Sequence, residues 1–149
     1  MTKMIELEKF PNHLQTLRLK DWESLFILLP EIEMTSNFGQ LKGGESLSEA
    51  SIAMPYWSSS QIVDKTFTAI MNLNLCPIFD WLNWQEGKAI LNNQAFDYGQ
   101  IDTIVLCKLL TLIIRADRFS DGYLISCFEN GVMTKIIKSL KENIIKVNK

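Results

Sequence analysis

Apolar residues recur with helical spacing along much of the chain, and this pattern carries most of its structural information. Trp22, Leu25, Phe26 and Leu29 fall at positions i, i+3, i+4 and i+7. They therefore occupy one face of a predicted helix, which Asp21 is suited to cap at its start. The proline that follows Leu29 is expected to kink or end this helix.

Several later segments show the same periodicity. The pattern predicts helices after the serines at 58–60, after Asp80 and after Ser120. A longer helix, expected over residues 100–118, is the most hydrophobic of the set and should be buried around most of its circumference. The last predicted helix has a regular apolar face, formed by Met133, Ile136, Ile137, Leu140, Ile144 and Val147.

Two regions between these helices lack the periodicity. Residues 37–51 are rich in glycine and serine, which predicts a loop. Residues 52–57 and 75–79 are expected to be extended, but each contains a proline, so neither should be more than an edge strand. Extended chain, helix and extended chain follow one another here, so a small parallel pair between the two segments is one option.

Together these elements predict a mainly α fold. We expect a single-domain bundle of about six helices over residues 20–149, with at most a small two-stranded β element. Residues 1–19 are expected to form an N-terminal arm or a short helix around Leu14 and Leu17. A chain of 149 residues buries about two thirds of its unfolded surface, so such a domain needs no disulfide or metal for stability.

The long central helix carries the most unusual polar residues. At about 100° per residue, one narrow stripe of that helix holds Lys108, Thr111, Arg115 and Arg118. Asp117 instead falls within the apolar face. A buried lone carboxylate is very costly, so it must protonate, pair with a cation or accept hydrogen bonds. Its partner is expected to come from another element, unless Asp117 caps the following helix.

This charged cluster has two interpretations. In the structural one, Arg115, Asp117, Arg118 and Asp121 form ion pairs and caps that lock two helices at a tight corner, where Gly122 allows close approach. In the functional one, the arginines hold an anionic ligand through their forked N–H donors. Structural networks of this kind are commoner than sites, so the structural interpretation is favoured.

Aromatic residues offer a second candidate surface. Tyr56 and Trp57 follow a proline, and together with Trp81 they are candidates to line a groove, because tyrosine and tryptophan are enriched at interfaces. Trp84 lies at helical spacing from Trp81, which favours a core position for it. Trp57, which precedes a run of serines, is expected to be the exposed tryptophan.

Composition excludes several function classes. The formal net charge is −2, without the basic balance typical of nucleic-acid binding proteins, so a nucleic-acid partner is not expected. His13 is the sole histidine, the three cysteines lack zinc spacing, and Gly43-Gly44 does not continue as a phosphate-binding loop, so neither a metal site nor a cofactor is predicted. No segment has the length and apolarity of a membrane span or signal peptide, which predicts a cytoplasmic protein away from membranes.

The charged corner also carries a family resemblance. The run Arg115-Ala116-Asp117-Arg118-Phe119, closed by Gly122, resembles the Arg-Ala-Asp-Arg-Phe-x-x-Gly signature of a bacterial family of small proteins of unknown function. An acidic residue often precedes the signature glycine in that family, and here it is Asp121. The similarity spans about residues 20–145 and includes 54–56, 79–81, 84–86, 128–131 and 136–140. The resemblance implies a single domain and no particular activity.

Three functional hypotheses follow. The leading one is a non-enzymatic interaction or ligand-binding domain with an unknown partner, self-association into a homo-oligomer being one form of that role. Its rival is a hydrolase or transferase that works through Asp80, Arg115, Asp117 and Arg118. The weakest is nucleic-acid binding through the lysines of the last helix. The sequence does not decide whether the chain is an enzyme.

Overall fold

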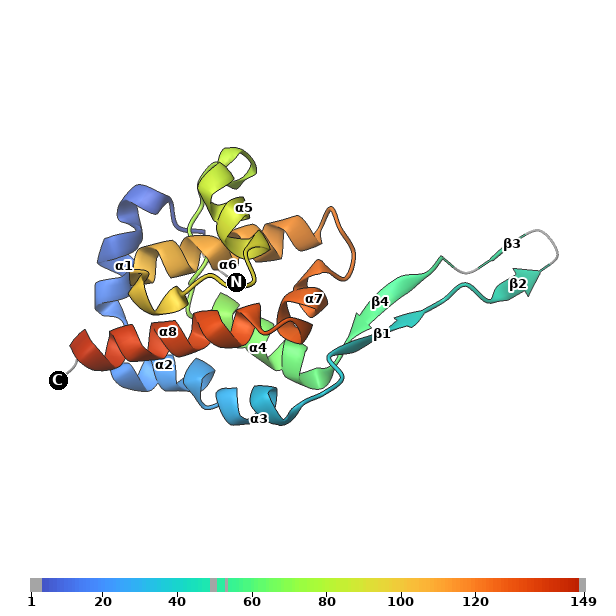
Figure 1. The fold of residues 1–149 in the computed structure, drawn as a ribbon, viewed down its shortest axis with the longest axis horizontal. Helices are drawn as coiled ribbons and strands as arrows, with labels where there is room; N and C mark the ends of the chain where they lie inside the picture. The colour runs from blue at the N-terminus through green and yellow to red at the C-terminus, as the bar shows by residue number, and fades with distance from the viewer. Residues whose placement is uncertain (1–3, 49–50, 53, 148–149) are drawn as a thin grey trace.

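The computed structural model describes residues 4–48, 51–52 and 54–147, and these form a mainly helical single domain, as predicted (Figure 1). They contain more α-helices than the expected six, because the N-terminal third is divided into three short ones. The helices are α1 (Phe10–Thr16), α2 (Leu19–Phe26), α3 (Leu29–Met34), α4 (Gln61–Asn72), α5 (Gln85–Asn92), α6 (Thr103–Asp117), α7 (Tyr123–Glu129) and α8 (Val132–Val147).

Helix α6 forms the centre of the domain. Figure 1 shows it running between α8 on one side and α5 on the other, and it contacts both. Its residues from Leu106 to Ile114 are buried except for Lys108, as the hydrophobic run predicts. The helix begins later than expected because residues 98–100 form a separate 3₁₀ turn. Asp102 then caps it by accepting a hydrogen bond of 2.9 Å from the backbone N–H of Val105.

The N-terminal helices and α8 complete the core. Phe10 at the start of α1 is fully buried, so the short-helix alternative for the first residues describes this segment better than a free arm. The break between α2 and α3 lies at residues 27–28, and Pro30 follows it in the first turn of α3, where its missing N–H costs nothing. The apolar face of α8 packs inward on α2, α3, α6 and α7. Among the described residues, no helix is both long and apolar enough to cross a bilayer.

A β-hairpin arm projects from one end of the helical body (Figure 1). Its inner part pairs β1 (Gly39–Lys42) with β4 (Tyr56–Ser59), and its outer part pairs β2 (Ser46–Ser48) with β3 (Ser51–Ile52). Both pairs are antiparallel.

The arm contradicts two expectations. The segment 37–51 was predicted to be a loop, and the glycines that suggested this are instead compatible with the hairpin. Gly43 adopts a φ of 86°, and a side chain there would collide with the backbone of Met54, which lies between β3 and β4. The predicted parallel pair between 52–57 and 75–79 is also wrong, because β4 pairs with β1.

Residues 75–79 find a different partner. Ile78 forms an isolated parallel bridge with Glu6: its N–H donates to the carbonyl of Ile5 at 2.8 Å, and its carbonyl accepts from the N–H of Leu7 at 3.1 Å. Residues 75–79 are therefore held beside the N-terminal segment.

Candidate functional site

Asp117 is the last residue of α6, and its carboxylate is used by the backbone of the next helix. Oδ1 accepts a hydrogen bond of 2.9 Å from the N–H of Leu124 in the first turn of α7. The side chain is partly buried rather than fully enclosed. Of the two explanations that the sequence left open for this residue, capping of the following helix is the one observed.

Asp121 and Gly122 join the same corner to the hairpin arm. Asp121 Oδ2 accepts a hydrogen bond of 2.8 Å from the N–H of Trp57 in β4. Gly122 has a φ of 85°, and a Cβ built on it would lie 2.5 Å from Cδ1 of the Trp57 indole. The sequence predicted that Gly122 allows two helices to approach closely, but the group that approaches it is the indole ring of Trp57 on the arm.

Arg115 and Arg118 do not join these carboxylates. Among the residues that the structure describes, no ion pair or hydrogen bond involves either guanidinium group. The predicted ion-pair network is therefore wrong. Its physical reason is that each carboxylate accepts from a backbone N–H instead, Asp117 from Leu124 in α7 and Asp121 from Trp57 in β4, while the arginines lie on another face of α6.

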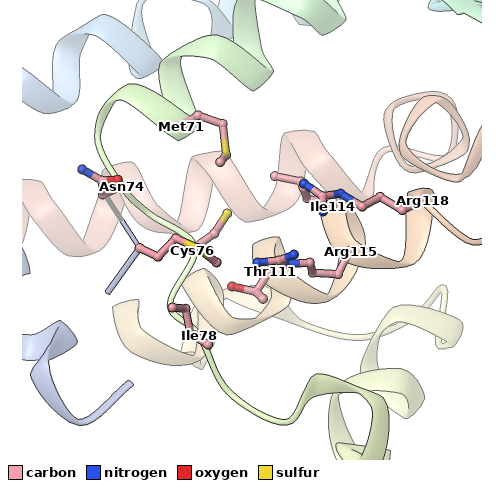
Figure 2. Close-up of a pocket in the computed structure, with 9 residues that line it drawn as sticks. Met71, Asn74, Cys76, Ile78, Thr111, Ile114, Arg115 and Arg118 are labelled. Carbon is pink, nitrogen blue, oxygen red and sulfur yellow. The ribbon is translucent and has the colours of Figure 1, made fainter. Parts of the chain in front are cut away.

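The two arginines instead line a cavity of about 220 Å³ (Figure 2). Thr111 and Ile114 of α6 share this wall, and Thr111 and both arginines belong to the polar stripe predicted from the sequence. Figure 2 shows both guanidinium groups on one side of the cavity, with Met71 and Cys76 facing them from the chain at the end of α4. Met4, Asn74 and Ile78 complete the lining.

Two hydrogen bonds and one unusual backbone position fix the opposite wall. Thr111 Oγ1 donates to the carbonyl of Pro77 at 2.9 Å, which attaches the segment 75–79 to α6. His13 Nε2 lies 2.8 Å from the carbonyl oxygen of Leu73 and holds the end of α4. Asn74 has a left-handed φ of 52°, a conformation that asparagine tolerates at helix ends. Its buried Oδ1 has no hydrogen-bond partner among the described residues.

Cys76 contributes a neutral thiol to the cavity. Burial raises its pKa from 9.0 to about 12, and neither the hydrogen bond with Thr111 nor the positive charge of Arg115 offsets that effect. The thiolate is the reactive form of cysteine. Cys76 is therefore protonated at neutral pH and acts here as a small, weakly polar wall residue rather than as a nucleophile.

The remaining candidate residues lie elsewhere. Asp80 is exposed and accepts a hydrogen bond of 2.7 Å from Nδ2 of Asn83, so its predicted role as a helix N-cap is wrong. A 3₁₀ turn over residues 81–83 takes the place of the helix start, and α5 begins only at Gln85. Neither Asp80 nor Asp117 lines the arginine cavity. The carboxylates and arginines of the rival enzyme hypothesis are thus not gathered around it.

The three candidate aromatic residues do not face one groove. Tyr56 and Trp57 are neighbours on β4, so their side chains point to opposite faces of the arm. Trp57 is 40% exposed, and it is the exposed tryptophan that the sequence predicts. Trp81 is partly buried, with its ring centroid 6.1 Å from that of Phe119 in the α6–α7 turn. Trp84 packs against the core, and Nζ of Lys108 lies 4.3 Å from its ring centroid.

The far wall of the cavity escaped the sequence analysis. Its residues come from three separate stretches of chain, around positions 4, 71 and 76, and none of them carries a motif. The nearest available signal is Asn74, since an asparagine just after a helical pattern indicates a left-handed helix end. Among the described residues, no group of three or more His, Cys, Asp and Glu side chains is placed to hold a metal ion.

Comparison with known proteins gives one match. The model of a family described as a family of unknown function matches residues 17–146. No curated protein and no solved structure matches the chain. The matched residues run from α2 to the penultimate residue of α8, and they include every described lining residue of the cavity except Met4.

Proposed function

The chain belongs to the family of unknown function DUF6508, and we propose that this member is a ligand-binding domain whose α6 arginines hold a small anion. The observation that carries the proposal is the state of Arg115 and Arg118. Two guanidinium groups line one cavity, and neither has a carboxylate or carbonyl partner among the described residues.

No carboxylate occupies the two arginines. Among the described residues, the ion pairs are Lys65–Glu31 and Lys138–Glu33, and both lie elsewhere in the sequence. The two carboxylates nearest in sequence, Asp117 and Asp121, are occupied by backbone N–H groups. The arginine donors therefore stay free to bind a carboxylate or phosphate group in the bidentate geometry that guanidinium favours.

The surroundings strengthen the attraction of the site for an anion. Most lining residues are apolar, and a cavity with such walls lowers the local dielectric constant, which makes a charge–charge interaction stronger than at an open surface. Cys76 is protonated and adds no negative charge. The cavity thus combines two cations with a neutral wall.

The same proposal explains the residues of the Arg-Ala-Asp-Arg-Phe-x-x-Gly run, which we infer to be a signature of the family. Arg115 and Arg118 serve the cavity, Asp117 caps α7, and Gly122 makes room for Trp57. Other members should therefore keep glycine at the position of Gly122 and arginine at the position of Arg115. Members with the same corner and no cation at these positions would contradict this inference.

The test compares three arginine variants. Arg115→Gln and Arg118→Gln each remove one cavity charge, while Arg18→Gln removes the same charge at an exposed site that lines no described part of the cavity. Thermal unfolding is followed with sulfate, phosphate and acetate against chloride at constant ionic strength. Anion binding should raise the melting temperature of the parent and of Arg18→Gln, and the rise should shrink in the two cavity variants.

Two results would overturn the proposal. One is a parent protein that no oxyanion stabilises beyond chloride, and the other is an equal response in all three variants. The second result would indicate a general effect of salt on surface charge rather than a site.

A further inference from the structure

The dimensions and lining of the cavity indicate which class of anion it binds. Resting on the proposed function, we infer that the ligand is a singly charged carboxylate with a short apolar body, with its carboxylate at Arg115 and Arg118 and its body along the opposite wall. The size of the cavity, its lining and its place on α6 each point to this class.

The volume sets the size of the ligand. An engineered protein cavity of about 150 Å³ binds benzene. The present cavity, at about 220 Å³, therefore has room for one ring or a chain of about six carbons together with one small polar group. It is too small for a nucleotide or another large phosphorylated molecule, since sites for drug-sized ligands begin at roughly 300 Å³.

The walls define an apolar region away from the charges. Met4, Met71 and Ile78 contribute thioether and aliphatic groups, and Cys76 adds its neutral thiol. Figure 2 shows Met71 and Cys76 across the cavity from the arginines. Methionine side chains adapt their shape to an apolar ligand without loss of contact.

Polar groups other than the arginines offer little to an anion. Thr111 already donates its hydroxyl proton to the carbonyl of Pro77. Asn74 lies on the side away from the arginines in Figure 2, and the part of its amide that is buried without a partner is the oxygen, an acceptor. The negative group is therefore directed to Arg115 and Arg118 and not to the other end of the cavity.

The position on α6 favours one negative charge over two. Arg115 lies in the last turn of the helix and Arg118 at its C-cap, where the helix dipole contributes partial negative charge. Phosphate sites typically use the opposite end of a helix, where free N–H groups point at the ligand. None of the lining residues belongs to the first turn of a helix. The local field therefore accommodates a carboxylate better than a phosphate dianion.

Isothermal titration calorimetry tests this at constant ionic strength with hexanoate, benzoate, acetate, hexanamide and inorganic phosphate. Hexanoate should bind more tightly than acetate by up to about fourfold for each methylene group that it buries. Hexanamide, which keeps the body and lacks the charge, should bind at least about tenfold more weakly than hexanoate. Benzoate should resemble hexanoate, and phosphate should be weaker than both.

Two variants distinguish the part of the cavity that binds the carboxylate from the part that binds the apolar body. Arg115→Gln should weaken hexanoate and acetate by similar factors, because both carry the same carboxylate. Met71→Gln should weaken hexanoate and leave acetate nearly unchanged. In protein with ¹³C-labelled methionine methyl groups, hexanoate should shift the resonance of Met71 and leave that of Met133, which is buried in the core, in place.

The outcomes distinguish this inference from the proposed function. If phosphate or sulfate binds in an Arg115-dependent way and hexanoate is no better than acetate, the anion site stands and the apolar-carboxylate inference is wrong. If hexanamide equals hexanoate, the cavity is an apolar site and both proposals are wrong. If no probe binds and the Met71 resonance stays fixed at every concentration, both are likewise wrong.

Discussion

The carboxylate of Asp121 accepts a hydrogen bond from the backbone N–H of Trp57 at 2.8 Å, across 64 positions of sequence. This contact joins the turn between α6 and α7 to strand β4 of the hairpin arm. Gly39 on the partner strand also lies close to the body, since a Cβ built on it would be 2.6 Å from Cδ1 of Ile125 in α7. The base of the arm is therefore fixed on both of its strands.

Removal of the Asp121 carboxylate should loosen the arm. Asp121→Ala leaves the Trp57 N–H without its protein partner, and we expect a loss of about 1 kcal/mol in the free energy of unfolding. Hydrogen exchange at the Trp57 amide should become faster than in the parent. Glu142→Ala, which removes an exposed carboxylate from α8, is the control and should leave that amide unchanged. Equal Trp57 exchange in the parent and Asp121→Ala would contradict the role of this bond.

Gly122 and Gly131 form a matched pair of positions. Both have a φ of 85°, but a Cβ at position 131 meets nothing within 4 Å, whereas one at position 122 collides with the Trp57 indole. Gly131→Ala should cost about 1 kcal/mol from backbone strain alone. Gly122→Ala should cost about 1–3 kcal/mol more, because the indole must move.

Urea unfolding measures this difference between the two alanine variants. Repeating both substitutions in a Trp57→Ala background provides the control, because the extra cost at position 122 should then largely disappear. An equal cost for the two variants in the parent background would show that the indole does not pack on Gly122.

Two substitutions distinguish the contribution of Asp117 as a helix cap from the contribution of its negative charge. Asparagine keeps a side-chain oxygen that accepts from a backbone N–H, so Asp117→Asn should change the free energy of unfolding by only a few tenths of a kcal/mol. Asp117→Ala removes the acceptor for Leu124 and should cost about 1 kcal/mol. Thermal or urea unfolding of the two variants provides the measurement. An asparagine variant as unstable as the alanine one would show that the negative charge, and not capping, is what stabilises the corner.

The buried thiols predict how stability changes at alkaline pH. Burial raises the pKa of Cys76 and of Cys127 from 9.0 to about 12. The unfolded chain therefore loses these protons near pH 9, whereas the folded chain keeps them to about pH 12. Their contribution is complete below pH 9, and stability should fall above it, by at most about 1.4 kcal/mol per pH unit for each thiol.

Urea unfolding between pH 8 and pH 10.5 measures this slope. Cys127→Ala should give a shallower decline than the parent, whatever its stability at pH 8. Tyr123, whose pKa burial also raises to about 12, should maintain part of the decline in that variant. A parent whose stability is level from pH 9 to pH 10.5 would contradict the raised thiol pKa values.

The helices were predictable from sequence where their apolar residues follow a regular pattern, because that pattern determines which residues are buried. The regular apolar pattern of α8 and the continuous apolar run of α6 correspond to the buried residues of these helices. The hairpin arm was not predictable in the same way, since its strands are short and rich in glycine and serine. Its pairing depends on anchors such as Asp121 and Ile125, which lie more than 60 positions away in sequence from the strands that they hold.

The candidate site was likewise predictable only in part. Helical geometry placed Thr111, Arg115 and Arg118 on one stripe, and this stripe forms one wall of the cavity. The predicted partners of the two carboxylates were wrong, because the sequence does not show that backbone N–H groups of α7 and β4 bind Asp117 and Asp121 in place of the arginines. The opposite wall could not be predicted, since only tertiary packing brings Met71 and Cys76 to α6.

The hairpin arm has a practical consequence for labelling this protein. Its outer strands β2 and β3 lie well away from the helical body in Figure 1, and no described residue of the arm lines the arginine cavity. A reporter peptide or fluorescent tag inserted between β2 and β3 would not contact the helices that form the cavity. The outer end of the arm, at β2 and β3, is therefore a suitable place to attach the domain to a sensor surface, away from the arginine cavity.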